Sequence, residues 1–136
     1  LLLGKPARPG LEGAVDHTLK FLSAVSSPAY PPDAGLLKTL ITASVERSYR
    51  PDGIARQMHA VMTDTERANQ LHRITAPTLV IHGKADPLVP YACGEDTARR
   101  IPGARLIGID GMGHDLPPPV VQSITDALTP FLHEHP

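Results

Sequence analysis

The chain has 136 residues, of which 41% are hydrophobic, so it is long enough to bury a core. Its formal net charge of −1 gives no electrostatic reason to expect nucleic acid or anionic lipid as a partner. No apolar run approaches the roughly 18 residues of a membrane-spanning helix, so we expect no membrane span. Cys93 is the only cysteine, which excludes an internal disulfide and predicts a cytoplasmic, reducing compartment.

The first half of the chain predicts three amphipathic helices. Residues 1–13 hold two prolines and three glycines without periodicity, and they predict a linker. Apolar residues then recur at three- and four-residue steps. The predicted helices cover residues 14–25, 36–50 and 54–62. A proline-rich break at 26–33 and Pro51 separate them, and Asp52 is expected to cap the third helix.

The second half predicts two strands that alternate with two helices. The predicted elements are a strand over 78–82, a helix over 92–100, a strand over 105–109 and a helix over 119–132. A strand, helix, strand unit is a crossover, so its two strands are expected to be parallel. Pro130 predicts a kink or an early end of the last helix, and residues 133–136 predict a frayed tail.

Each predicted strand runs into a loop with a residue of catalytic type. Residues 78–81 lead through His82-Gly83 to Asp86, in a turn held by Pro87 and Pro90. Residues 104–109 lead into the glycine-rich loop that ends in His114. Because the ends of parallel strands lie at one edge of a sheet, we expect the carboxylate and the imidazole to form a catalytic pair.

The stretches PTLVIHGKADPLVP and IPGARLIGIDGMGHDLP resemble the last third of an α/β-hydrolase of the esterase, lipase and methylesterase group. The resemblance implies the α/β fold class and the C-terminal portion of an α/β-hydrolase fold. Residues 1–74 would form a helical lid with its return connection, and residues 75–136 the strand, helix, strand, helix part of a parallel sheet. It also implies that Asp86 is the acid and His114 the base of a catalytic triad, in the Asp-before-His order of that family.

The nucleophile of that family is absent from the sequence. Its serine sits in a Gly-x-Ser-x-Gly turn, and none of the serines here has glycine at both offsets. They are Ser23, Ser26, Ser27, Ser44, Ser48 and Ser123. The resemblance therefore implies a C-terminal piece whose serine is supplied by a missing N-terminal half or by a partner chain. Two parallel strands also leave unpaired edges, so we expect the isolated 136 residues to be inactive and marginally stable.

The function that the resemblance implies is hydrolysis of a small carboxylic ester through a Ser-His-Asp triad. Haloalkane and epoxide hydrolases use an Asp nucleophile at the same turn and would leave this half of the fold similar, so the residue at that turn decides between them. The contrasting interpretation is a truncated, non-catalytic fragment or a ligand-binding relative on the same fold. We expect no cofactor and no metal, since the sequence has no metal-ligand spacing, phosphate-binding glycine loop or nucleotide fingerprint.

Several further residues are weaker candidates. His82 is expected to pack or to hydrogen-bond within the acid loop, and Asp115 could compete with Asp86 as the carboxylate that orients His114. Asp110 has no assigned role, and Cys93 is interpreted as an unreactive, partly buried helix residue. The side chains that could face a substrate but more simply form a solvated helix face are Arg47, Arg56 and His59.

Overall fold

The computed structural model describes residues 4–135, which form two compact units. One unit runs to Ala24 and resumes over Pro32–Thr65; the other comprises Val25–Pro31 and the chain from Glu66 onward. The connector Val25–Pro31 thus belongs with the later part of the chain. The division into a lid over residues 1–74 and a core over residues 75–136 stays a prediction.

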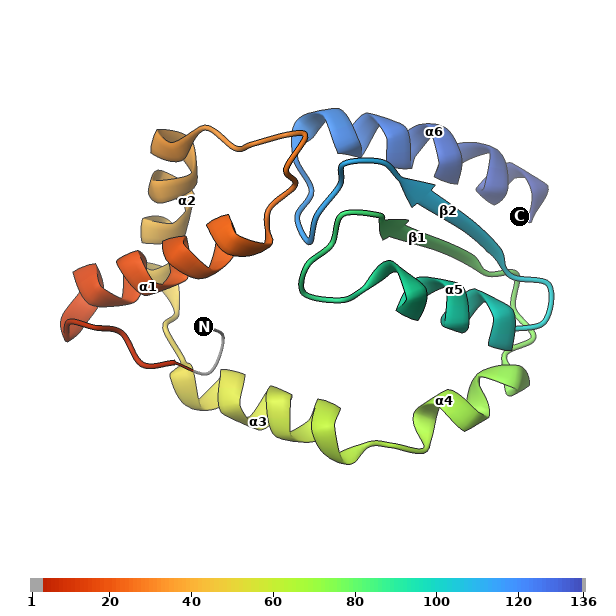
Figure 1. The fold of residues 1–136 in the computed structure, drawn as a ribbon, viewed down its shortest axis with the longest axis horizontal. Coiled ribbons are helices and arrows are strands. Elements are labelled where there is room, and N and C mark those ends of the chain that lie inside the picture. The colour runs from red at the N-terminus through yellow and green to blue at the C-terminus, as the bar shows by residue number, and fades with distance from the viewer. Residues whose placement is uncertain (1–3, 136) are drawn as a thin grey trace. The chain divides into compact units, whose positions relative to one another are not determined.

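The first unit is helical, as the sequence predicts (Figure 1). Its helices are α1 (Gly10–Val25, whose last residue belongs to the second unit), α2 (Ala34–Arg47) and α3 (Pro51–Thr63). Ala14 and Val15 of α1 and Ile41 and Val45 of α2 are buried together and form its core. The apolar stripes at helical spacing therefore pack against each other, which is the usual source of stability for such helices.

The starts of α2 and α3 have different causes. Asp33 caps α2, because its Oδ1 atom accepts a hydrogen bond of 2.7 Å from the backbone N–H of Leu36. The prediction that Asp52 caps α3 is wrong: α3 begins at Pro51, and Asp52 lies in its first turn. Proline suits the first helical position, since its fixed φ matches the helix and no N–H is needed there.

The second unit contains the predicted strand, helix, strand, helix order. After α4 (Arg67–Gln70) and the 3₁₀ turn η1 (Leu71–Arg73) come β1 (Leu79–Gly83), α5 (Tyr91–Arg100), β2 (Arg105–Ile109) and α6 (Pro118–Glu134). β1 and β2 are parallel, with a register that runs from Leu79 opposite Arg105 to Gly83 opposite Ile109. The predicted parallel crossover is confirmed.

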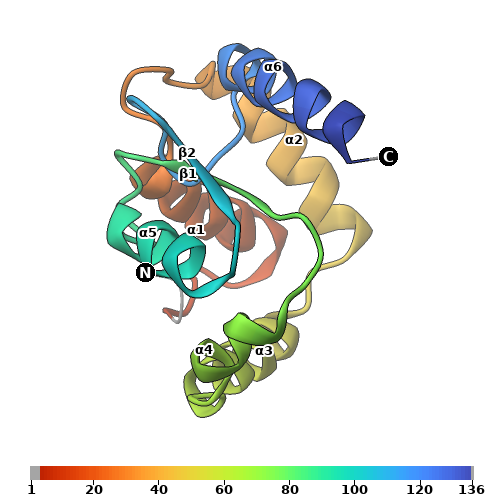
Figure 2. The same cartoon turned by 90° about the vertical axis from the view of Figure 1, so that its right-hand side faces the viewer.

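The two helices cover opposite faces of this small sheet: α5 lies on one side and α6 on the other (Figures 1 and 2). On the α6 side, Ile109, Met112 and Val120 are buried, and Ile81, Ile107 and Ile124 pack around them. Covering both faces is what a parallel sheet requires. The core therefore lies next to the ends of the two strands, from which the loops with Asp86 and His114 start.

Helix α6 does not end early at Pro130, and it continues to Glu134. The Glu134 carboxylate lies 2.9 Å from the Arg105 guanidinium, which also lies 4.8 Å from the centre of the Phe131 ring. The prediction of a frayed tail is therefore wrong for His133 and Glu134, which belong to the last turn of α6, although both are exposed; His135 follows the helix, and Pro136 lies outside the described residues.

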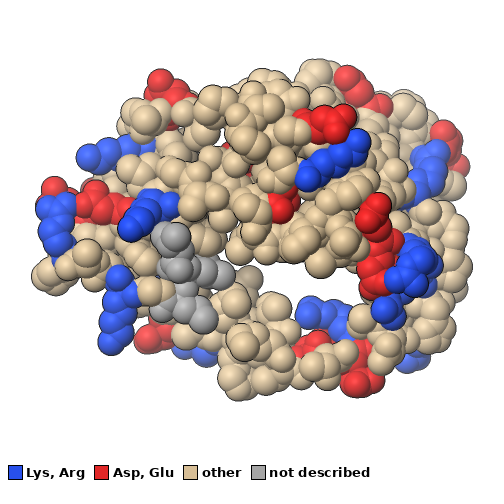
Figure 3. Space-filling model, viewed as in Figure 1, with Lys and Arg blue, Asp and Glu red and all other residues tan. Residues whose placement is uncertain are grey.

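Figure 3 shows acidic and basic side chains next to one another at several places on the surface. On α5, Asp96 forms ion pairs with both Arg99 and Arg100. Such exposed pairs contribute little to stability. Within residues 4–135, no helix combines the length and the apolar character needed to cross a membrane.

Candidate active site

Asp86 lies in the loop that leaves β1, and its carboxylate is fixed by the backbone that follows it. Its Oδ1 atom accepts hydrogen bonds from the N–H groups of Leu88 and Val89, at 2.8 and 2.9 Å. Asp-Pro at positions 86 and 87 favours this local turn, because an aspartate side chain readily bonds to the backbone two or three residues on. The side chain is only 4% exposed, and one oxygen remains for another partner.

His114 lies in the loop that leaves β2, and its backbone is held as well. Its N–H donates a hydrogen bond of 2.8 Å to the carbonyl of Val25. Gly111 precedes it with a φ of 71°, a backbone conformation that glycine adopts without strain. The His114 side chain is 45% exposed, so the ring is accessible to a reactant.

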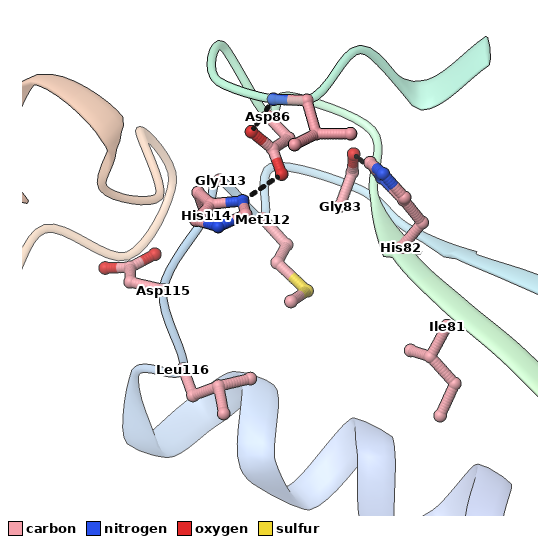
Figure 4. Close-up of a pocket in the computed structure, with 10 residues that line it drawn as sticks. Ile81, His82, Gly83, Asp86, Met112, Gly113, His114, Asp115 and Leu116 are labelled. Carbon is pink, nitrogen blue, oxygen red and sulfur yellow. Dashed lines mark hydrogen bonds and ion pairs between the residues drawn. The ribbon is translucent and has the colours of Figure 1, made fainter. Parts of the chain in front are cut away.

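The two loops bring the predicted residues together. Nδ1 of His114 lies 2.7 Å from Oδ2 of Asp86 (Figure 4). Burial alone would raise the pKa of Asp86, but the hydrogen bonds from Val89, His114 and Leu88, and the charge of His114, outweigh it and hold that pKa below its ordinary value. Asp86 is therefore a carboxylate at neutral pH, and Nε2 of His114 is the ring nitrogen left to exchange a proton.

A pocket of about 350 Å³ lies beside this pair. Its walls include the polar side chains of Asp86, His114 and Asp115 (Figure 4). The apolar side chains that line it are Ile81, Val89, Met112 and Leu116. An apolar cavity with a few convergent polar groups is the usual form of a small-molecule site.

The other histidine and carboxylates of these loops have separate partners. His82 lies 3.0 Å through Nδ1 from the carbonyl oxygen of Gly83 and stacks edge-on with Tyr91 of α5, so the predicted packing role is confirmed. Asp115 bonds to Ser27 rather than to His114, which removes it as the orienting carboxylate. Asp110 pairs with Lys84 at 2.9 Å on the surface.

The remaining candidates lie on exposed helix faces. Cys93 is on α5 as predicted, but it is exposed rather than partly buried. Arg47, Arg56 and His59 are exposed, in agreement with a solvated helix face. Among residues 4–135, no cluster of three or more His, Cys, Asp or Glu side chains is arranged to hold a metal ion.

The residue that the sequence did not single out is Ser27. It is 1% exposed, and its hydroxyl contacts both Asp115 and the backbone N–H of Gly113. In the sequence it stands in SSPAYPPD, whose composition is typical of a linker. Nothing in that composition or spacing indicates a contact with a loop 86 to 88 residues later.

A known protein family and several known proteins match this part of the chain. The family model described as "TAP-like protein", an α/β-hydrolase family, matches residues 50–135. The match covers both loops and both strands. It begins at the residue before α3.

Two curated relatives are similar over parts of the chain. Rhodomycin D methylesterase DnrP of Streptomyces peucetius is 40% identical over 62 residues, which are 46% of this chain and 21% of the relative. The putative carbamate hydrolase RutD of Pseudomonas savastanoi pv. phaseolicola is 38% identical over 80 residues, which are 59% of this chain and 28% of the relative. These matches thus span less than a third of each relative.

A similar fold is present in solved structures. The bromoperoxidase from Bacillus anthracis superposes with a TM-score of 0.71 at 23% sequence identity, over 88% of this chain and 44% of the other. At that identity the likeness concerns the fold. It indicates that the chain corresponds to somewhat less than half of a complete fold of this kind.

Proposed function

Because the chain belongs to the α/β-hydrolase family, in its TAP-like group, we propose that it contributes the acid and the base of a serine hydrolase that cleaves carboxylic esters. The observation that carries the proposal is the 2.7 Å contact between Nδ1 of His114 and Oδ2 of Asp86, at the ends of two adjacent parallel strands. One curated relative, similar over 62 residues, is named a methylesterase, which supports an ester as the substrate.

In the proposed reaction, His114 acts as the general base and Asp86 orients it. Nε2 of His114 takes the proton of a serine hydroxyl as its oxygen attacks the ester carbonyl. Asp86 accepts the Nδ1–H bond, which fixes the tautomer and stabilises the imidazolium. His114 then returns the proton to the leaving alcohol, and an acyl-enzyme forms. A water molecule, deprotonated by the same nitrogen, releases the acid and regenerates the serine.

We propose that the serine lies outside the 136 residues, in an N-terminal half or a partner chain. The sequence has no Gly-x-Ser-x-Gly turn. The Ser27 hydroxyl contacts the histidine loop, but the residue is 1% exposed and donates to Asp115. A buried hydroxyl that already donates to a carboxylate is a poor nucleophile for an external ester.

A methyl ester or another small ester is the proposed substrate class. The relative of highest identity reported above is named a methylesterase, and the second acts in name on a carbamate, which has the same kind of carbonyl centre. The apolar lining of the pocket from Ile81, Met112 and Leu116 suits the uncharged part of an ester.

The helices within residues 1–74 are proposed to form the lid. A cytoplasmic location stays a prediction from the single cysteine.

A fluorophosphonate probe, which reacts with activated serines, tests the proposal by intact mass. In the complete protein from its source, we expect one probe per chain on a species heavier than 14.5 kDa. His114→Ala should slow labelling by about 10⁴-fold, since the serine loses its base. His133→Ala is the control, because His133 is an exposed residue in the last turn of α6.

Three results separate the alternatives. If the probe labels His114→Ala as fast as the wild type, His114 is not the base. Hydrolysis that requires His114 in a protein that the probe does not label indicates an Asp nucleophile, as in haloalkane and epoxide hydrolases. A protein of 14.5 kDa that neither reacts with the probe nor hydrolyses esters is a non-catalytic fragment or binding protein.

A further inference from the structure

The segment Val25–Tyr30, which we call the strap, contains a buried polar side chain that the proposed chemistry does not use. Ser27 is 1% exposed, and it is the buried polar residue among residues 4–135. The strap belongs to the same compact unit as the acid and histidine loops. A hydroxyl removed from water at this point needs good partners, and its hydrogen-bond partners, Gly113 and Asp115, flank His114.

The strap lies along the histidine loop in the antiparallel direction. The N–H of His114 donates to the carbonyl of Val25 at 2.8 Å, and the N–H of Gly113 donates to Oγ of Ser27 at 2.8 Å. Further along, the N–H of Ala29 donates to the carbonyl of Gly111 at 3.3 Å. Later strap residues thus meet earlier loop residues. Gly111, Gly113 and His114 thus each bond to a different strap residue, namely Ala29, Ser27 and Val25.

The glycines of the loop make this close approach possible. A Cβ atom on Gly113 would lie 2.6 Å from the carbonyl carbon of Ser26, and one on Gly111 would lie 2.3 Å from Cβ of Ala29. Gly111 also has a positive φ, whereas Gly113 does not. A glycine is therefore needed at position 113 because the strap backbone approaches closely, and not because the chain turns sharply there.

Ser27 joins the two residues that flank His114. Its hydroxyl accepts the N–H of Gly113 and donates to Oδ1 of Asp115. Its backbone N–H donates to the same Oδ1 atom at 2.8 Å. One serine thus holds the residue before His114 through the backbone and the residue after it through a carboxylate. Figure 4 shows the Asp115 carboxylate directed away from Asp86.

We propose that Ser27 and Asp115 are positioning residues, which hold the His114 ring against Asp86. The ring itself is 45% exposed, so packing alone does not fix it. Its loop contains Gly111 and Gly113, which restrict the backbone least. Without the bridge, the loop gains conformations in which Nδ1 of His114 no longer lies 2.7 Å from Asp86. The consequence for catalysis rests on the proposed hydrolase function; the consequence for the ring position does not.

The first measurement is the proton NMR resonance of the His114 Hδ1 atom in the full protein. A proton shared between an imidazole and a carboxylate in a short, charge-assisted hydrogen bond resonates at low field. We expect Ser27→Ala and Asp115→Ala to broaden or abolish this resonance. Asp115→Asn should preserve it, because the amide oxygen still accepts from both the N–H and the hydroxyl of Ser27.

The second measurement is ester hydrolysis by the same variants. We expect kcat to fall by about 10²-fold in Ser27→Ala and Asp115→Ala with little change in KM, since a small displacement of a catalytic group has that effect. Asp115→Asn should recover kcat to within a few fold of the wild type. The double variant should be no worse than either single variant, because both remove the same bridge. Ser123→Ala and Asp126→Ala, at exposed positions of α6, are the matched controls.

The outcomes separate this proposal from the hydrolase function. If the Hδ1 resonance and kcat are unchanged in Asp115→Ala, or if Asp115→Asn is as impaired as Asp115→Ala, the positioning role is wrong. If the resonance is present in the wild type and is lost in Ser27→Ala and Asp115→Ala, but the wild type hydrolyses no ester and takes no probe, the positioning role stands and the hydrolase function fails. Should Ser27→Ala not fold, the comparison of Asp115→Ala with Asp115→Asn still decides.

Discussion

Nδ1 of His114 lies 2.7 Å from Oδ2 of Asp86, although 28 residues separate them in the sequence. The sheet register explains the meeting. Gly83 at the end of β1 lies opposite Ile109 at the end of β2, so the two loops leave the sheet side by side. The backbone N–H groups of Leu88 and Val89 bond to the Asp86 carboxylate, and the backbone N–H of His114 bonds to the strap. The Asp86 carboxylate and the His114 backbone therefore each have hydrogen-bond partners besides the contact between the two side chains.

Asp86→Asn should remove most activity and leave the fold intact. The amide oxygen can keep the bonds from Leu88 and Val89, which places the NH₂ group against Nδ1 of His114. An NH₂ group donates, so the imidazole has to carry its proton on Nε2 and cannot act as a base there. We expect kcat for ester hydrolysis to fall by about 10⁴-fold.

The control for that variant is Asp126→Asn, on the exposed face of α6, which should leave kcat unchanged. Circular dichroism of both variants checks the fold. A folded Asp86→Asn protein with wild-type kcat would mean that Asp86 is not the acid.

The lowered pKa of Asp86 predicts a specific dependence of stability on pH. The ionised form is favoured in the folded state, so its contribution is present above the ordinary value of 3.8 and is lost as the pH falls through 3.8 toward the lower folded value. The free energy of unfolding, measured with urea across this range, should therefore drop more steeply in the wild type than in Asp86→Asn. The two curves should approach each other at the acidic end.

Asp96→Asn provides the comparison for the pH experiment. The hydrogen bond from Arg100 and the charges of Arg100 and Arg99 also lower the pKa of Asp96, but Asp96 is on α5, away from the histidine loop. The free energy of unfolding of Asp96→Asn should therefore still fall as steeply at acidic pH as Asp86 makes it fall in the wild type. Parallel curves for the wild type and Asp86→Asn would refute the assignment of this decline to Asp86.

The strands and the acid and histidine loops could be predicted from the sequence, because each strand is a short apolar run that ends near glycine. β2 matches its predicted range, and β1 differs by one residue at each end. Local rules were less reliable at helix ends. Asp52 is a common capping residue, but the adjacent proline had already started α3.

The strap could not be predicted, because its contacts join residues far apart in sequence. Ser27 and Asp115 are separated by 88 residues, and neither lies in a periodic segment. Gly113 stands in a loop that the sequence shows only as glycine-rich, yet its lack of a side chain matters for the approach of Ser26. Tertiary contacts of this kind decide which polar residues of a loop are available for chemistry and which are structural.

Pro130→Ala should stabilise the protein. Pro130 lies inside α6, where it offers no N–H to the carbonyl four residues earlier. Proline in a helix interior costs up to about 3 kcal/mol relative to alanine, and part of that should be recovered. Urea unfolding should show a higher midpoint. Pro118→Ala is the matched control, because Pro118 is the first residue of α6, where no N–H is needed and no gain is expected. Equal shifts for both variants would contradict this explanation.

Gly113→Ala should destabilise the second unit and disturb the histidine. The added Cβ would lie 2.6 Å from the carbonyl carbon of Ser26 and 2.7 Å from the carbonyl oxygen of Val25. Both are backbone atoms, so the strap has to move, at a cost of about 1–3 kcal/mol. The movement should also break the bond from the Gly113 N–H to Ser27.

Gly53→Ala is the control for this steric effect, and urea unfolding of the two variants is the measurement. Gly53 lies in α3 with a negative φ, and the nearest atom to a Cβ there is 3.7 Å away. Alanine at that position should be neutral or stabilising by up to about 1 kcal/mol, since it favours the helix. If Gly113→Ala and Gly53→Ala unfold at the same urea concentration, the strap does not constrain the histidine loop, and the bridge through Ser27 loses its structural basis.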